Sequence, residues 1–282
     1  MLLRLGDVEI WRILESVDPF MAPQDFFPDM GPDGLELMRR EVPRQLCQTT
    51  GKMLLPIQGF LVKTPQHVIL IDACIGNDKT CEFEELWHKR SDGRFLAGLR
   101  AAGVEPKDID YVMCTHLHID HVGWNTRLED GRWVPTFPNA RYIFPAADHD
   151  HFSSEPGVTY QESVLPVIAA NQAELVGPDH KLGDYLSLIS TPGHTPGHVA
   201  VEVAHADKVA VVTGDVMHSP IQCLKPEWNF AYDNEPDLAA KSRRKFLEMA
   251  SERQNLILGS HFPLPSHGKV VAKSDAFAWL ED

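Results

Sequence analysis

Alternating runs of apolar and polar positions along the chain predict strands that alternate with helices. The two apolar runs in LLPIQGFLVKTPQHVILIDACIGN are separated by KTPQH, which predicts a β-hairpin. DGRFLAGLRAAGV has the spacing of a helix that ends near Gly103, whereas DIDYVMCTHLH has the pattern of a buried strand. RYIFP and three later apolar runs predict further strands, and DLAAKSRRKFLEMASER predicts a helix. This order indicates a mixed α/β fold with two sheets packed face to face and helices outside.

Proline, glycine and aspartate interrupt this pattern in two places. DPFMAPQDFFPDMGPDG carries turn signals without a sustained period, so residues 17–40 are predicted to form a long N-terminal loop. Phe20, Phe26 and Phe27 either pin this loop to the core or line a pocket that it covers. YQESVLPVIAANQAELV predicts a helix that is interrupted at Pro166.

Side chains that can bind metals follow directly after one predicted strand, in THLHIDHVGWN. Alternate residues of an extended segment share a face, so His116 and His118 can reach one metal ion together. A turn or helix start after them would direct Asp120 and His121 towards a second ion. Because histidine is uncommon and here occurs in tandem after a hydrophobic strand, the pattern favours metal binding over a solvated loop.

Three later apolar runs end in turns that carry further candidate ligands. In STPGHTPGH, Pro192 and Gly193 predict a tight turn that directs His194 away from the strand, where it would complete a set of three histidines. Asp215 in VVTGDVMHSP follows an apolar strand, where burial of an isolated carboxylate is costly without a cation, and it can bridge two metals. His261 in LILGSHFP would be the last nitrogen ligand. Taken singly, Asp215 or His261 would fit a role in a helix cap or a turn as well as it fits a metal ligand.

With these motifs the sequence resembles the metallo-β-lactamase superfamily, from HVILIDACIGN to GSHF. The resemblance implies a four-layer αβ/βα sandwich with a dinuclear zinc site at the sheet edge. It also implies one zinc ion on His116, His118 and His194, a second on Asp120, His121 and His261, and Asp215 bridging them. Manganese, iron and cobalt are the alternative metals.

Two more residues are expected to support this site without binding metal. Asp72, at the end of the strand in LIDACIGN, matches an acidic position that supports the site from behind in the family. His198 fits a residue that orients a ligand, or a histidine of the core, better than a direct ligand.

Composition excludes several classes of partner. Lys+Arg 26 against Asp+Glu 40 gives a formal net charge of −14, which disfavours a nucleic-acid partner. No apolar run approaches the roughly 20 residues of a membrane-spanning helix, so no membrane association is expected. Five dispersed cysteines indicate a reducing compartment, and we expect a cytoplasmic protein. Residues 1–282 are predicted to form a single metallo-β-lactamase-like domain that acts on a small molecule, and the resemblance implies a homodimer as a candidate assembly.

Within the superfamily the chain resembles the lactonase and organophosphate-hydrolase branch. PEWNFAYDNEPDLAAKSRRKFLEMA matches this branch, with a tryptophan and an acidic loop before an arginine-bearing helix. True β-lactamases of the superfamily lack an aspartate at the position of Asp215, which weighs against antibiotic hydrolysis. Many acyl-homoserine lactone lactonases have a tyrosine three residues after the bridging aspartate, where this chain has His218. That departure favours other lactones, aryl esters or phosphotriesters over the quorum signal.

The resemblance therefore implies a zinc-dependent hydrolase that opens a small lactone or cleaves an ester with a hydroxide that bridges the two metal ions. The candidate catalytic residues are Asp120, Asp215 and His218. His218 also fits the alternative of a histidine at a strand end that has no catalytic role. The predicted substrate pocket is lined by Phe20, Phe26, Phe27, Met53, Trp124 and Trp228. A phosphotriesterase acting at the same site and an iron-dependent oxidoreductase are the alternatives.

Overall fold

The computed structural model describes residues 1–281, and the chain divides into two compact units. Unit 1 comprises Met1–Glu15 and Ile57–Tyr185, and unit 2 comprises Ser16–Pro56 and the chain from Leu186 onward. Each unit contains a mixed set of strands and helices, so the predicted α/β class is confirmed.

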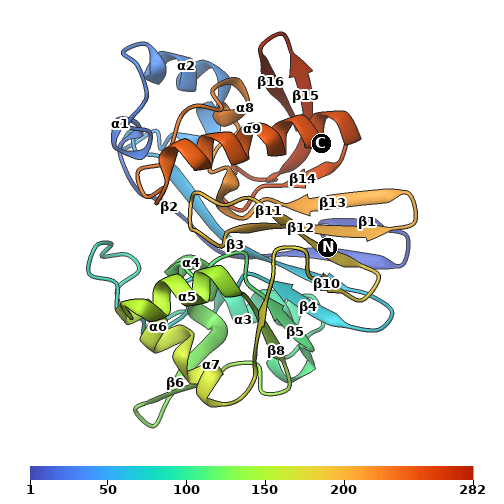
Figure 1. Ribbon diagram of the computed structural model, residues 1–282. Coiled ribbons are helices and arrows are strands. Elements are labelled where there is room, and N and C mark those ends of the chain that lie inside the picture. Colours follow the sequence, from blue (N-terminus) through green and yellow to red (C-terminus); the bar gives the residue numbers. More distant parts are fainter. Residues whose placement is uncertain (282) are drawn as a thin grey trace. The chain divides into compact units, whose positions relative to one another are not determined.

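Unit 1 contains most of a seven-stranded sheet (Figure 1). In hydrogen-bonding order its strands are β1 (Leu3–Leu5), β2 (Val8–Pro19), β3 (Leu54–Lys63), β4 (Val68–Ile71), β5 (Tyr111–Met113), β8 (Arg141–Pro145) and β9 (Ala173–Val176). β3 and β4 form the predicted antiparallel hairpin, and β4, β5, β8 and β9 run parallel. β4, β5 and β8 are short and almost entirely buried, as expected for strands covered on both faces, whereas β9 at the edge of the sheet is partly exposed.

Helices and one small hairpin complete unit 1. The helices are α3 (Arg94–Ala101), η2 (Pro106–Asp108), α4 (Ile119–Val122), η3 (Gly123–Asn125), α5 (Ala146–Ser154), α6 (Val158–Ser163) and α7 (Leu165–Ala169). α5 packs against β8 and β9, and α6 lies beside α7 (Figure 1). The hairpin consists of β6 (Thr126–Glu129) and β7 (Arg132–Pro135), and the two-residue strand β10 (Lys181–Leu182) follows near the end of the unit.

Unit 2 contains a second sheet and a long helix. The strands, in hydrogen-bonding order, are β11 (Leu186–Ser190), β12 (Val199–His205), β13 (Lys208–Val212), β14 (Leu256–Leu258), β15 (His267–Lys273) and β16 (Ala276–Glu281). Helix α9 (Pro236–Arg253) lies against this sheet (Figure 1), and its Phe246, Leu247 and Ala250 share one buried cluster with Val211 and Ile257 of β13 and β14. This apolar stripe of α9 therefore holds the helix over the strands that carry the later candidate ligands.

The parallel strand pairs place the ends of distant segments together. β4 and β5 are parallel with Ile71 opposite Met113, and β13 and β14 are parallel with Val212 opposite Leu258. Parallel strands leave a sheet at the same edge, so Asp72 emerges beside Thr115 in unit 1. In unit 2, Asp215 emerges beside the segment that carries His261 for the same reason.

Two predictions of secondary structure are corrected. The segment 17–40, expected as a loop, contains α1 (Pro23–Phe26) and most of α2 (Gly34–Glu41). Proline and glycine are turn signals in the sequence of this segment. Pro23, however, lies in the first turn of α1, a position that tolerates proline. The break between α6 and α7 falls at Val164 and not at Pro166, because Pro166 lies in the first turn of α7.

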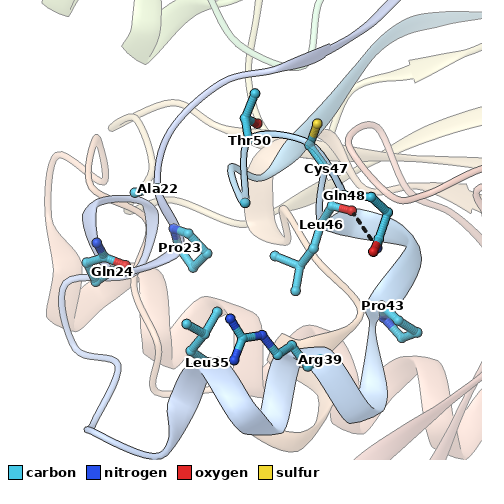
Figure 2. A pocket seen from close by; sticks show the side chains of 11 residues that line it. Ala22, Pro23, Gln24, Leu35, Arg39, Pro43, Leu46, Cys47, Gln48 and Thr50 are labelled. Carbon is cyan, nitrogen blue, oxygen red and sulfur yellow. Dashed lines mark hydrogen bonds between the residues drawn. The ribbon is translucent and has the colours of Figure 1, made fainter.

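Unit 2 also contains several short helices. They are η1 (Pro43–Gln45), η4 (Gly214–Val216) and α8 (Ile221–Leu224), in addition to α1 and α2. A cavity of about 540 Å³ lies between α1, α2 and the chain that follows η1. In Figure 2, Leu35, Leu46 and Arg39 point into this cavity. In the part of the chain that the structure describes, no helix is both long and apolar enough to cross a membrane.

Candidate metal centre

In unit 1, the first candidate ligands lie on an extended segment that ends in a helix. β5 ends at Met113, His118 is still extended (φ −75°, ψ 159°), and α4 begins at Ile119. The ring nitrogens His116 Nε2 and His118 Nδ1 face one another at 3.1 Å. The helix start then turns Asp120 and His121 to the same side, where Asp120 Oδ2 lies 3.6 Å from His121 Nε2. The structure thus brings together the four predicted residues of unit 1.

A buried carboxylate fixes the orientation of two of these rings. His121 Nδ1 donates to Oδ2 of Asp72 at 2.8 Å, and the backbone N–H of Thr115 donates to Oδ1 of the same carboxylate at 2.8 Å. The hydroxyl of Thr115 lies 3.1 Å from His116 Nδ1 and also contacts Asp72. Asp72 therefore occupies the supporting position that the sequence predicts, and it directs the Nε2 atoms of His116 and His121 away from itself.

In unit 2, three histidines surround the carboxylate of Asp215. Oδ2 of Asp215 lies 3.2 Å from His194 Nε2 and 3.1 Å from His218 Nε2, and Oδ1 lies 3.0 Å from His261 Nε2. All four side chains are buried. Gly214, which precedes Asp215, has a left-handed φ of 52°, a conformation that favours glycine and turns the chain out of β13.

The second ring nitrogen of two of these histidines is also engaged. His194 Nδ1 donates to Asp233 Oδ1 at 2.9 Å, and His261 Nδ1 donates to the carbonyl of Pro56 at 2.8 Å. When such a ring is neutral and donates through Nδ1, the lone pair is on Nε2, the atom that faces Asp215 in both cases. This tautomer is the one that a histidine uses to bind a metal through Nε2.

The buried charges of unit 2 favour a cation at this place. Burial alone would lower the pKa of His194, but hydrogen bonds to Asp215 and Asp233 raise it to about 9. Burial lowers the pKa of His218 to about 4, against the opposing effect of Asp215. His194, Asp215 and His218 also have ligand atoms close enough together to hold one ion. Imidazole nitrogens with carboxylate oxygens form the donor set of zinc sites, so the residues present in both units fit this metal.

His198 supports the site through the backbone. Its Nε2 accepts from the N–H of Asp215 at 2.7 Å, while its Nδ1 lies 2.8 Å from the hydroxyl of Thr191. Both ring nitrogens therefore have protein partners, which corresponds to the supporting role weighed for this residue and not to direct coordination.

The predicted pocket residues of unit 2 form one aromatic cluster beside His218. Phe26 contacts Phe27 and Phe230 with centroid distances of 4.8 and 4.6 Å, and Phe27 contacts Trp228 at 5.8 Å. Phe230 packs on the ring of His218 at 4.0 Å. Phe20 lies at the edge of the cluster, 6.5 Å from Phe26, and its backbone N–H donates to the carbonyl of Met53.

Trp124 has a different environment, inside unit 1. Its ring stacks on Phe95 at 5.3 Å, and its Nε1 donates to the buried carboxylate of Glu15 at 2.7 Å. Glu15 also accepts from the backbone N–H groups of Ile75 and Gly76. The contacts of Trp124 thus hold the loop after β4 in place.

Sequence reasoning missed four residues near the ligands of unit 2. Asp233 contacts His194, Arg243 contacts Asp233 at 3.1 Å, Phe230 packs on His218, and Gln45 donates to the carbonyl of His218 at 2.9 Å. The motif WNFAYD contained a signal for two of them, because an aromatic and acidic loop precedes the arginine of α9. Gln45 carries no such signal.

Strands that end in candidate histidine and aspartate ligands are typical of a metal-dependent enzyme fold. The chain belongs to the metallo-beta-lactamase superfamily, whose family model matches residues 54–261. The match confirms the predicted family and fold.

The relatives of the chain within this superfamily are named lactonases and hydrolases. An N-acyl homoserine lactonase from a Bacillus species is 26% identical in an alignment of 228 residues, and the alignment covers 76% of this chain and 84% of the relative. Among solved structures, the dizinc quorum-quenching lactonase AidC has a TM-score of 0.82 at 21% identity, and the hydrolase AbOPH has a TM-score of 0.83 at 24% identity. Both comparisons cover 99% of this chain and 96% of the other chain, and they show the shared fold. With the family match, these relatives confirm the predicted enzyme class, a metal-dependent hydrolase.

Proposed function

We propose that the protein is a zinc-dependent lactonase that opens a small, neutral lactone carrying an apolar substituent. The observation that carries this proposal is the convergence of three buried histidine Nε2 atoms on the Asp215 carboxylate. The N-acyl homoserine lactonases among the relatives support the substrate class.

The proposed ligand assignment follows the family resemblance. His116, His118 and His194 would hold one ion, Asp120, His121 and His261 the other, and Asp215 both. Zinc suits this mixture of imidazole and carboxylate, and manganese, iron or cobalt are the alternatives. When bound, two such ions would make a water molecule available as a nucleophile at neutral pH and would stabilise negative charge on the substrate.

The protein's own groups would then manage the protons of the reaction. Asp215 and His218 are in hydrogen-bond contact at 3.1 Å, so a proton taken from the attacking water by Asp215 can pass to His218. From His218 it can be donated to the oxygen of the leaving alcohol as the ring opens. Asp120 is the other proposed catalytic carboxylate, placed to orient the water. No side-chain nucleophile is required.

The aromatic cluster of unit 2 would select the substrate. Phe20, Phe26, Phe27, Met53 and Trp228 are buried apolar residues of the cluster that contacts His218, and we propose that they form the wall of the substrate pocket. Such a surface favours an acyl or aryl group over a charged substituent. Trp124 is omitted from the proposed lining, because its ring is engaged with Phe95 and Glu15.

Phosphotriester hydrolysis is the second candidate, and His218 is the observation that favours it. Many acyl-homoserine lactone lactonases of the resembled branch have a tyrosine at this position, and the imidazole of His218, which contacts Phe26, Phe230 and His261, lacks the phenolic hydroxyl. The curated relatives, in contrast, favour N-acyl homoserine lactones. Both substrate classes therefore belong in the same assay.

A chelator-controlled substrate panel tests the proposed function. Purified protein with quantified metal would be assayed on N-acyl homoserine lactones, simple lactones, aryl esters and phosphotriesters. We expect two zinc ions per chain, lactone hydrolysis that disappears after chelation, and recovery on addition of zinc. Full activity in metal-free protein would contradict the mechanism. Bound iron with visible absorbance and oxygen consumption would instead indicate the oxidoreductase alternative.

The cellular setting is also proposed on chemical grounds. All five cysteines are free thiols, which supports a reducing, cytoplasmic location. A homodimer, implied by resemblance to the branch, would be detected by light scattering of the purified protein.

A further inference from the structure

The turn that carries His194 is held by a short segment that begins at Asp233. The backbone N–H of Asn234 donates to the carbonyl of His194 at 3.0 Å, and that of Glu235 donates to the carbonyl of Gly193 at 2.8 Å. Asp233 Oδ1 accepts from His194 Nδ1 at 2.9 Å. One segment therefore holds both the main chain and the ring of His194.

Close packing of the same turn against α9 leaves no room for it to shift. Gly193 has a φ of 130°, and a Cβ atom there would lie 2.2 Å from the backbone nitrogen of Ala239. The hydroxyl of Ser242, one turn further along α9, donates to the carbonyl of Pro192 at 2.6 Å. The position of His194 thus depends on α9 as well as on the segment at Asp233.

Asp233 is itself fixed by the largest fully buried side chain of the described residues, Arg243. Nη2 of Arg243 donates to Asp233 Oδ2 at 3.1 Å, and neither side chain is exposed to solvent. Nε donates to the carbonyl of Val216 at 2.9 Å, and Nη1 donates to the carbonyls of Pro226 and Trp228 at 2.8 and 2.9 Å. The guanidinium therefore joins the segment after Asp215, the segment of Trp228 and the partner of His194.

We propose that Asp233, held by the buried guanidinium of Arg243, is a positioning residue that fixes the tautomer and direction of the metal ligand His194. This inference rests on the proposed zinc site. A carboxylate that accepts from Nδ1 keeps the proton on that nitrogen and increases the basicity of Nε2, which strengthens its binding to a metal ion. Arg243 prevents the carboxylate of Asp233 from turning away, because a carboxylate between two donors has one favourable orientation.

The zinc affinity of the protein tests this role without a measurement of turnover. Wild type, Asp233→Asn, Arg243→Lys and the matched control Asp237→Asn would be compared by competition with a chromophoric chelator. Asp237 lies four residues from Asp233, in the first turn of α9, and is exposed. We expect Asp233→Asn to raise the zinc dissociation constant by about 10- to 100-fold, Arg243→Lys to raise it in the same direction, and Asp237→Asn to leave it unchanged.

A second measurement separates positioning from simple stabilisation. In the cobalt-substituted protein, Asp233→Asn should shift the visible absorption bands, since the field at His194 changes. A variant that melts at a lower temperature but retains wild-type zinc affinity and cobalt bands would overturn the positioning role. If Asp233→Asn does not fold, a folded Arg243→Lys protein with unchanged zinc affinity would overturn it equally. If the wild-type protein does not bind zinc, both the proposed function and this inference are wrong. If wild type binds zinc and Asp233→Asn binds it with the same affinity, only the inference is wrong.

Discussion

His218 Nε2 lies 3.1 Å from Oδ2 of Asp215, and the ring of His218 is parallel to that of His261 at a centroid distance of 5.5 Å. This contact connects the carboxylate proposed to bind both metals with a residue that is absent from the family ligand set. His218 can therefore relay a proton or bind a metal, because its ligand atom also groups with those of His194 and Asp215.

Replacing His218 by phenylalanine distinguishes these two roles. If His218 relays a proton, His218→Phe should lower kcat by about 10²- to 10⁴-fold and still contain two zinc ions per chain. Steady-state kinetics with metal analysis of the same sample would measure both. His205→Phe is the control: His205 is the last residue of β12, and this variant should retain activity. Loss of one zinc ion from His218→Phe would show that His218 is a ligand.

The aromatic cluster gives a prediction about substrate size. Phe27 and Trp228 are buried and pack on one another, so truncation of either should remove part of the surface that an acyl or aryl group would contact. Phe27→Ala and Trp228→Ala should raise KM for a long-chain lactone by about tenfold, equivalent to about 1.4 kcal/mol of lost binding. A short-chain lactone assayed on the same variants is the internal control. Equal changes in KM for both substrates would exclude the mutated residue from the lining.

The candidate ligands could be predicted from sequence because their signals are local. His116, His118, Asp120 and His121 lie within six consecutive positions after an apolar strand, and the strand-to-helix transition that separates them follows from that pattern. Asp215 and His261 also follow apolar runs, and the parallel pairing of β13 and β14 explains why those runs end together. The pattern of apolar residues thus specifies where a strand ends.

Residues that support the ligands could not be predicted in the same way. Asp233 lies 39 positions from His194 in sequence, and no periodicity links a carboxylate in a loop to a turn of another segment. Gln45 lies 173 positions from His218, whose carbonyl it contacts. Helices α1 and α2 were missed because each is short and begins near proline or glycine, and packing stabilises such helices more than their own propensity does.

A buried lysine in unit 1 predicts a specific pH dependence of stability. Burial lowers the pKa of Lys79 to about 7, although Glu162 and Asp78 oppose the shift, and its Nζ lies 3.6 Å from the centre of the Trp133 ring. In the unfolded chain a lysine has a pKa of about 10.4, so between these values the unfolded state binds more protons than the folded state. Stability contributed through Lys79 therefore rises with pH across this window.

Lys79→Met should remove that contribution. The unfolding free energy of wild type minus that of Lys79→Met should increase by up to about 1.4 kcal/mol for each pH unit between pH 7 and 10. Urea unfolding at several pH values measures the difference, with exposed Lys107→Met as the control. A difference independent of pH would show that Lys79 keeps an ordinary proton affinity in the folded protein.

Cys47 should be the reactive thiol of the native protein. It is the one cysteine among five that is not buried, and it lies at the cavity of Figure 2. Hydrogen bonds from Thr50 and Thr49 lower the pKa of the Cys47 thiol, whereas burial raises the pKa of Cys81 to about 11 and that of Cys74 well above its usual range. Since the thiolate is the reacting species, modification should be selective for Cys47.

Thiol labelling near neutral pH tests this selectivity. Folded wild type should react rapidly at one thiol and the urea-unfolded chain at all five, as counted by intact-mass spectrometry. Cys47→Ser should remove the rapid reaction, and Thr50→Ala should slow it, because the hydrogen bond that stabilises the thiolate is lost while access to the sulfur is retained. Rapid labelling that persists in Cys47→Ser would identify another accessible thiol, and an unchanged rate in Thr50→Ala would attribute the reactivity of Cys47 to exposure alone.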